Sequence, residues 1–201
     1  MALTRKLAPL IGALAVVALF MGQSTLDTYS IVIGNGLGID TKSMGTILAI
    51  NAPLAMLGPL AATKYGERAG LIAPIIVAEV LVAVGQWLLV QAASPILFGL
   101  TYGVLGVIAG FGLPYVIALL ARLDRSGRFA AAAPACIMIG SAIGPALGGH
   151  LIGAASFQPI ALAAIVGIGL SVVLFVTAAL LAKINLLGHD SGCISELDIP
   201  R

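Results

Sequence analysis

Charged side chains are scarce in this chain. Asp, Glu, Lys and Arg make up only 9% of its 201 residues, whereas 60% are hydrophobic and the mean hydropathy is +1.14. Soluble domains carry about 25% charged residues, so the composition excludes a soluble domain. The net charge of +2 gives no reason to expect a nucleic-acid partner. The surroundings that this composition favours are those of a lipid bilayer.

Cysteines and metal-ligand clusters are nearly missing too. The two cysteines, Cys136 and Cys193, are too few and too far apart for a disulfide framework. His150 and His189 each stand alone, and the sequence has no phosphate-binding loop and no paired carboxylates. Ser141 and His150, on one predicted helix, are half a turn out of phase and over ~10 Å apart, which does not suit a nucleophile and its base. We expect no metal, no cofactor and no enzyme activity.

Long uncharged runs, by contrast, are abundant and predict membrane-spanning helices. The runs 7–26 and 43–63 can each cross a hydrocarbon core, which takes ~20 residues. The runs 80–121 and 129–182 are each too long for one helix, and each is interrupted by a Ser and a nearby Pro that suits a helix start. We therefore predict an all-α membrane protein. Its six predicted helices are Ala8–Ile33, Ser43–Tyr65, Gly70–Val90, Pro95–Ala121, Phe129–Gly153 and Phe157–Ile184.

The basic residues predict how the chain lies across the membrane. With both termini in the cytoplasm, only Lys42 falls outside. The basic residues that then fall inside are Arg5, Lys6, Lys64, Arg68, Arg122, Arg125, Arg128, Lys183 and Arg201. This asymmetry follows the positive-inside rule. We predict a multi-pass protein of the cytoplasmic (inner) membrane, with a transmembrane domain, 1–184, and a polar, disordered cytoplasmic tail, 185–201.

The N-terminus also resembles a signal peptide, because Arg5 and Lys6 precede an apolar run. That run is longer than the apolar core of a typical signal peptide, and the segment after Gly22 offers no Ala-x-Ala cleavage site. We therefore interpret the segment as an uncleaved first helix.

The fifth predicted helix carries a dense glycine motif. Glycines four residues apart line one stripe of a helix where a neighbour can pack backbone to backbone, and a Pro removes a backbone donor and bends the helix. Residues 138–153 contain Gly-x-x-x-Gly-Pro-x-x-Gly-Gly, formed by Gly140, Gly144, Pro145, Gly148 and Gly149. This spacing resembles the fifth-helix motif of proton-coupled antiporters in the major facilitator superfamily. Ordinary close packing in any multi-pass protein is the alternative explanation.

The second predicted helix repeats part of this motif. Gly58-Pro59 lies late in that helix, as Gly144-Pro145 lies late in the fifth, although the two helices run in opposite directions. Two three-helix units of opposite orientation would give this placement. The resemblance implies such a 3+3 inverted repeat, because each half of a major facilitator protein contains one. A short Gly-Pro match also arises by chance.

The loop after the second helix resembles another motif of the superfamily, the cytoplasmic sequence Gly-x-Leu-Ala-Asp-Arg-x-Gly-Arg-Arg. Segment 59–68 keeps Gly66 and Arg68, but Thr63 stands where the family has Asp. In the family this acidic residue supports a charge relay during the conformational change, so the resemblance does not extend to the relay. A glycine turn flanked by basic residues is the alternative interpretation.

The fourth predicted helix lacks the membrane-embedded Arg of the antiporter pattern. It carries instead Gly99, Gly103, Gly106 and Gly110, which lie on one face and predict tight packing. A degenerate loop motif combined with the missing Arg resembles the C-terminal six-helix half of a major facilitator protein. The resemblance covers nearly all of the predicted transmembrane domain.

Glu79 is the only formal charge near the middle of a predicted helix. Burying a carboxylate there costs at least ~2.5 kcal/mol, so it should face protein or water, or carry a proton. One hypothesis is a proton-coupling site. The alternative is a neutral Glu that stabilises helix packing, with Gln86 as a partner on the same face. The family geometry favours this alternative, because the third helix of each half lies at the periphery.

Polar residues gather at the outer end of the first predicted helix. In the family this helix and the fourth line the transport cavity. The resemblance therefore implies that Gln23, Asp27 and Tyr29 contact the substrate. Asn51 on the second helix and Tyr115 on the fourth complete the set of candidates. The alternative is a helix end that emerges among lipid headgroups, where Asp and Tyr are common.

These features predict a half-length secondary transporter of the major facilitator type, split or truncated, that moves an unidentified small molecule. Proton-coupled efflux is the form that the antiporter motif suggests. Transport in this family needs two halves around a midplane site, so the resemblance implies a homodimer or a second six-helix half as partner. The alternative is a non-transporting membrane scaffold or partner-binding subunit.

Overall fold

The computed structural model describes residues 2–124, 126–151 and 156–193, and these residues form helices and no strands. The helices are α1 Ala2–Asp27, α2 Ser30–Gly36, α3 Thr41–Ala55, α4 Leu57–Tyr65, α5 Ile72–Val90, α6 Pro95–Leu123, α7 Arg128–Leu151 and α8 Gln158–Cys193. Within the described ranges, 6 stretches are long and apolar enough to cross a membrane: Leu7–Gly36, Thr41–Tyr65, Ile72–Val90, Pro95–Leu123, Arg128–Leu151 and Gln158–Lys183. The prediction of an all-α protein with six helices able to cross a membrane is confirmed for the residues that the structure describes.

Two of the spans are interrupted, where the sequence predicted continuous helices. A turn at Thr28-Tyr29 separates α1 from α2 within the first span, and Met56 separates α3 from α4 within the second. Pro59 lies three residues after the second break, and its ring excludes the carbonyl of the residue four positions earlier from helical hydrogen bonding. That residue is Ala55, where α3 ends. α7 contains Pro145 and yet remains one helix.

Capping side chains define several helix ends. Ser94 accepts a hydrogen bond from Leu97 N and precedes Pro95 at the start of α6, as the sequence predicted. At the start of α3, the Asp40 carboxylate accepts hydrogen bonds from the hydroxyl and the backbone N–H of Ser43. These bonds lower the pKa of the Asp40 carboxyl below its usual value.

The last helix is longer than predicted. α8 continues past Ile184, its predicted end, to Cys193. The first part of the segment predicted as a disordered tail is therefore helical, and residues 194–201 of that segment lie outside the described residues. The predicted end of the fifth helix at Gly153 also lies outside them.

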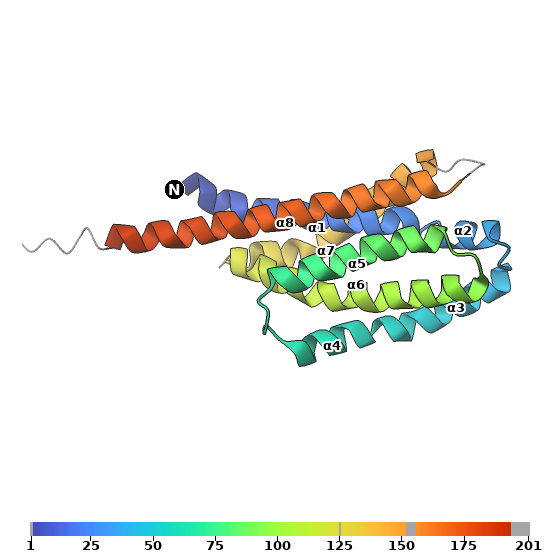
Figure 1. Ribbon diagram of the computed structural model, residues 1–201. Coiled ribbons are helices and arrows are strands. Elements are labelled where there is room, and N and C mark those ends of the chain that lie inside the picture. The colour runs from blue at the N-terminus through green and yellow to red at the C-terminus, as the bar shows by residue number, and fades with distance from the viewer. Residues whose placement is uncertain (1, 125, 152–155, 194–201) are drawn as a thin grey trace, which may run out of the picture.

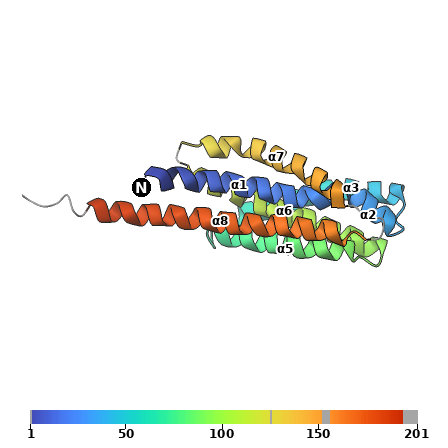
Figure 2. The ribbon, with the colours of Figure 1, turned by 90° about the horizontal axis from the view of Figure 1, so that it is seen from above.

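α1 and α6 are the two central helices. α1 packs against α7 and α8, and α6 packs against α5 and the α3–α4 pair (Figure 1 and Figure 2). α5 and α8 pack on each other and join the two groups. The start of α1 and the end of α8 lie at the same end of the bundle, as an even number of crossings requires.

The apolar core consists of two clusters that follow each other along the helices. One cluster includes Val16, Ile75 and Leu120, and the other includes Leu26, Leu89 and Phe98. In α1 and α5, the stretch between the two clusters carries polar side chains, and three of these, Gln23, Glu79 and Gln86, line the cavities described below.

Glycines bring the helices close together at two contacts. On α7, a Cβ added at Gly144 would lie 2.6 Å from the Met21 carbonyl oxygen and 2.8 Å from the Thr25 nitrogen, both in the backbone of α1. On α4, a Cβ added at Gly58 would lie 2.5 Å from the Phe111 nitrogen in the backbone of α6. Real side chains do not tolerate these distances, so only glycine allows the backbones to approach this closely.

Candidate functional site

Two adjoining cavities lie between α1, α3, α5 and α6, within the stretches that are long and apolar enough to cross a membrane. The first, of about 100 Å³, is lined by polar side chains from four helices: Gln23, Asp27, Asn51, Gln86 and Tyr102. We call it the Asp27 cavity. The second, of about 210 Å³, contains Glu79 and is otherwise mostly apolar. We call it the Glu79 cavity. Gln23, Val82, Gly106 and Ala109 line both, so the two share a wall.

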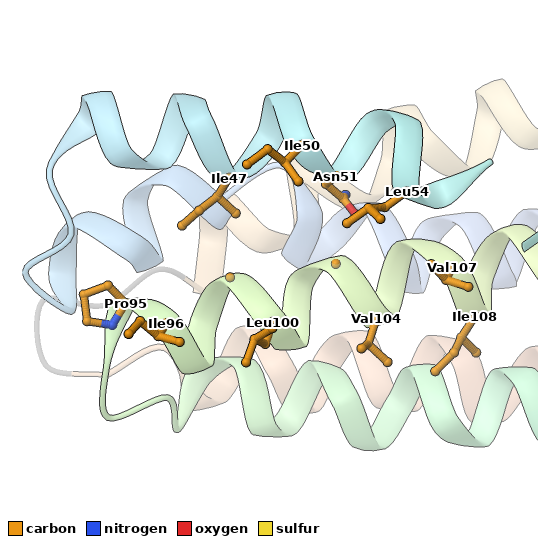
Figure 3. Close-up of a pocket in the computed structure, with 12 residues that line it drawn as sticks. Ile47, Ile50, Asn51, Leu54, Pro95, Ile96, Leu100, Val104, Val107 and Ile108 are labelled. Carbon is orange, nitrogen blue, oxygen red and sulfur yellow. The ribbon is translucent and has the colours of Figure 1, made fainter. Parts of the chain in front are cut away.

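A glycine makes room for one of the polar groups. Asn51 extends from α3 toward α6 (Figure 3), where a Cβ added at Gly106 would lie only 2.5 Å from Asn51 Oδ1. Any larger residue at position 106 would push the amide out of the Asp27 cavity. The third glycine of the predicted α6 stripe therefore leaves space for a polar side chain as well as for a neighbouring helix.

The polar side chains form two hydrogen-bonded pairs. The Tyr102 hydroxyl donates to Asp27 Oδ1 at 2.8 Å, which joins α6 to α1. The Ser171 hydroxyl of α8 hydrogen bonds to Glu79 Oε2 of α5. Glu79 is 3% exposed and Ser171 is 0% exposed, so the second pair is fully inside the bundle, whereas Asp27 is exposed at the surface.

Three oxygens in these cavities have no partner among the described residues. They are Asn51 Oδ1, Glu79 Oε1 and Gln86 Oε1, and each is inaccessible to solvent. Buried polar atoms are nearly always hydrogen bonded in folded proteins, so three unpaired acceptors in adjoining cavities mark a place for a ligand or for ordered water.

The predicted substrate-contact residues separate into two groups. Gln23, Asp27 and Asn51 come together in the Asp27 cavity. Tyr29 and Tyr115 lie elsewhere and join helices instead. The Tyr29 hydroxyl donates to Pro145 O at 2.7 Å, and the Tyr115 hydroxyl lies 3.2 and 2.9 Å from the carbonyl oxygens of Ala62 and Gly66.

The partner of Glu79 differs from the one considered in the sequence. Gln86 was the expected partner on the same helix face, but the structure pairs Glu79 with Ser171 and leaves Gln86 in the other cavity. The reason is the distance along α5: seven residues of helix separate the two by about 10 Å. Ser171 comes from α8, which packs directly on α5.

The loop after α4 is a glycine turn. Gly66 has a φ of +63°, which L side chains rarely adopt, and it ends α4. Thr63, in the place of the family's Asp, donates to the carbonyl of Leu60 within its own helix. The charged link at this end is the exposed pair of Glu67 and Arg122, and Arg68 lies exposed beside it.

An apolar groove lies between α3 and α6, next to the Asp27 cavity (Figure 3). It has a volume of about 610 Å³, and among the described residues that line it only Asn51 has a polar side chain. Ile47, Leu54 and Val104 are typical of its walls. Although the groove is larger than either cavity, its lining offers chemistry for hydrocarbon alone, so we place the candidate site in the two polar cavities.

The sequence did not identify Tyr102 and Ser171 as site residues. Each is a polar residue inside an otherwise apolar helix, and this is the signal that could have marked them. Their partners, Asp27 and Glu79, are 75 and 92 positions away in the sequence, so only the packing of the helices shows the pairs.

The site provides two carboxylates, three unpaired acceptors and no metal-ligand cluster within the described ranges. Such an arrangement can bind a ligand that donates hydrogen bonds, or it can hold a proton. The chain matches no protein-family model, and no curated protein is significantly similar to it.

Proposed function

We propose that this chain is one six-helix half of a secondary transporter of the major facilitator type, most similar to the C-terminal half. In this proposal it lies in the cytoplasmic membrane with both termini inside, and it moves a small molecule together with a second half. The observation that carries the proposal is a pair of helix contacts that match each other under one constant shift in the sequence.

The shift is 86 positions, which relates Gly58 to Gly144 and Pro59 to Pro145. Gly58 packs on the Phe111 backbone, and Gly144 packs on the Thr25 backbone. Position 111 is again 86 after position 25. The residues on α1 and α6 therefore exchange roles in the two contacts, as a two-fold inverted repeat requires.

The tyrosines follow the same shift. Tyr29, in the turn between α1 and α2, donates to Pro145 O of α7, and Tyr115 on α6 contacts Ala62 O of α4. Position 115 is 86 after position 29. In both cases a tyrosine binds a carbonyl of the helix that carries the Gly-Pro pair, although the shift of 86 would place the acceptor of Tyr115 at Pro59 and not at Ala62. A chance Gly-Pro match would not bring its packing partners and a matching tyrosine with it.

The wider arrangement of the helices supports the same repeat. If the first three spans exchange with the last three in order, the contact of α1 with α7 becomes that of α6 with the α3–α4 pair, and the contact of α1 with α8 becomes that of α6 with α5. All four contacts are present, and the contact of α5 with α8 maps onto itself.

The polar cavities supply the path for the substrate. Gln23, Asp27 and Asn51 lie between α1, α3 and α6, and one half of a major facilitator protein forms only one wall of the transport path. We propose that the second half, another copy or a different chain, covers this wall. Glu79 is our proposed proton-coupling residue, because it is a buried carboxylate with one unpaired oxygen.

Mass measurement in lipid nanodiscs, combined with flux in vesicles, tests the proposal. We expect a dimer or a complex with another subunit. Vesicles loaded with a pH-sensitive dye should report proton movement when the small-molecule fraction of a cell extract is added. Glu79→Gln should abolish that signal, and Glu67→Gln, an exposed carboxylate outside both cavities, should leave it unchanged.

Two results would count against the proposal. A monodisperse monomer that still drives flux would require the whole path to lie within six helices. A stable complex without any flux would favour the alternative function, a non-transporting membrane scaffold or partner-binding subunit.

A further inference from the structure

The charge of the two cavities indicates which ligands they admit. Their lining contains two carboxylates, Asp27 and Glu79, and no Lys, Arg or His among the described residues. The amides of Asn51 and Gln86 can present either an oxygen or a nitrogen to a ligand, so they do not select its charge. The carboxylates do, and they favour a cation that carries N–H donors.

The walls of the Glu79 cavity indicate the body of that ligand. Apart from Glu79 and Gln23, it is lined by apolar residues and glycines, with Phe20, Ile75 and Val116 among them. An inorganic cation needs oxygen ligands on all sides, whereas this cavity presents a carboxylate on one side and hydrocarbon on the others. An ammonium group carried on a short hydrocarbon chain matches both surfaces.

The position of the unpaired oxygens agrees with such a ligand. Glu79 Oε1 lines one cavity, and Asn51 Oδ1 and Gln86 Oε1 line the other, across the wall that the two cavities share. Glu79 and Gln86 are 3% and 4% exposed, so bulk water does not reach these side chains. A primary ammonium placed at the Glu79 carboxylate donates one of its N–H groups to the unpaired Glu79 Oε1.

We propose that the Glu79 cavity binds a small primary amine in its ammonium form. The ammonium group donates to Glu79 Oε1, and the hydrocarbon chain packs on Phe20, Ile75 and Val116. This inference names the substrate class of the proposed transporter, and as a statement about transport it rests on that function.

A ligand series on the unmodified chain in lipid nanodiscs tests the inference. The probes are n-butylammonium, n-butanol, butyrate and sodium, and the readout is the shift of the melting temperature with probe concentration. We expect n-butylammonium to bind at least ten-fold more tightly than each of the others. Equal binding of n-butanol would mean that the hydrocarbon alone is recognised, and equal binding of sodium would mean that the site takes an inorganic cation. Either result, or tighter binding of butyrate, would overturn the inference.

A matched pair of variants assigns the binding to the cavities. Glu79→Gln keeps the size of the side chain and removes its charge, and it should weaken n-butylammonium binding at least ten-fold. Glu67→Gln makes the same change at an exposed position outside both cavities, and it should bind like the unmodified chain. Equal losses in both variants would show that the amine binds the general negative charge of the protein. If Glu79→Gln does not fold, the ligand series still decides.

The failure of this inference can be told apart from the failure of the proposed function. If the chain pairs and drives flux but does not prefer n-butylammonium, the transporter has another substrate class. If n-butylammonium binds as expected but the chain neither pairs nor drives flux, the amine site exists in a protein that does not transport.

Discussion

The two glycine contacts of this protein differ in how far they close. The contact of α7 with α1 is closed along its length: a Cβ added at Gly140, Gly144 or Gly148 would come within 3 Å of the α1 backbone. The contact of α6 with the α3–α4 pair is closed only at one end. There, a Cβ added at Gly110 would lie 2.6 Å from Ala55 O, whereas at Gly103 it would lie 3.6 Å from the Leu54 side chain, an ordinary contact.

This difference shows that a glycine stripe gives a helix the ability to approach a neighbour, and that the neighbour decides whether it does. Toward α6, α3 presents Ile47 and Leu54, whose side chains stand between the two backbones (Figure 3). Toward α7, α1 presents its backbone around Met21 and Thr25. The apolar groove of about 610 Å³ is the space that remains on the open side.

The largest effect is expected in a topology assay, because a reporter fusion is either active or inactive. The assay tests which side of the membrane the open end of the α3–α6 contact faces. Reporter fusions after Arg68, Arg128 and Ile184 should read cytoplasmic, and fusions near Lys42 and Ser94 should read external, as should one near Ser156. The open end would then face outward. An external signal at Arg128 would contradict this orientation, because the positive-inside rule keeps basic loops inside.

A substitution in the closed contact should have the next largest effect. Gly144→Leu forces a side chain into the backbone of α1, and overpacking of this kind costs about 1–3 kcal/mol. We expect a lower folded yield in detergent and a lower melting temperature. Gly103→Leu is the matched control in the open contact, where it should be tolerated because the groove has room. Equal behaviour of the two variants would mean that the contacts do not differ in the membrane.

Removal of a tyrosine hydroxyl should weaken either contact by a smaller amount. Tyr29→Phe removes the hydrogen bond to Pro145 O, and Tyr115→Phe removes the bonds to the α4 end. A single hydrogen bond contributes about 0.5–1.5 kcal/mol net, so each variant should show a similar, modest drop in melting temperature. If Tyr115→Phe alone were destabilising, the two contacts would not be equivalent members of a repeat.

The smallest expected effect is a gain in the open contact. Gly103→Ala adds one methyl group at ordinary contact distance from Leu54 and restricts the unfolded chain, which should stabilise the protein by roughly 0.5 kcal/mol. The melting temperature should therefore rise slightly. A clear loss of stability would show that α3 and α6 come closer together in the membrane than in this structure.

Much of the fold follows from the sequence. The uncharged runs define the six spans, because a bilayer core leaves few alternatives to an apolar helix of sufficient length. Ser94 and Pro95 define the start of α6, because their side chains act on the adjacent backbone. The break at Met56 was not predicted, although Pro59 lies three residues after it. Pro145 lies inside the uninterrupted helix α7, so a proline by itself does not determine whether a helix is interrupted.

Part of the candidate site was predictable as well. Gln23, Asp27, Asn51 and Glu79 stood out because polar residues are costly in hydrocarbon and must face protein or water. No feature of the sequence separated them from Tyr29 and Tyr115, which join helices and line neither cavity. That distinction depends on the rotation of each helix about its axis, which its neighbours decide.

The sequence by itself determined how many times the chain can cross a membrane. It also determined which polar residues should avoid lipid and which glycines can allow close helix packing. These are local properties, since the hydrophobic effect and backbone hydrogen bonding act on each segment separately. Only the tertiary structure decided that Ser171 pairs with Glu79, that Gly106 makes room for Asn51, and that one glycine contact closes while the other leaves a groove. These outcomes depend on side chains from helices far apart in the chain, and they appear only when the helices pack together.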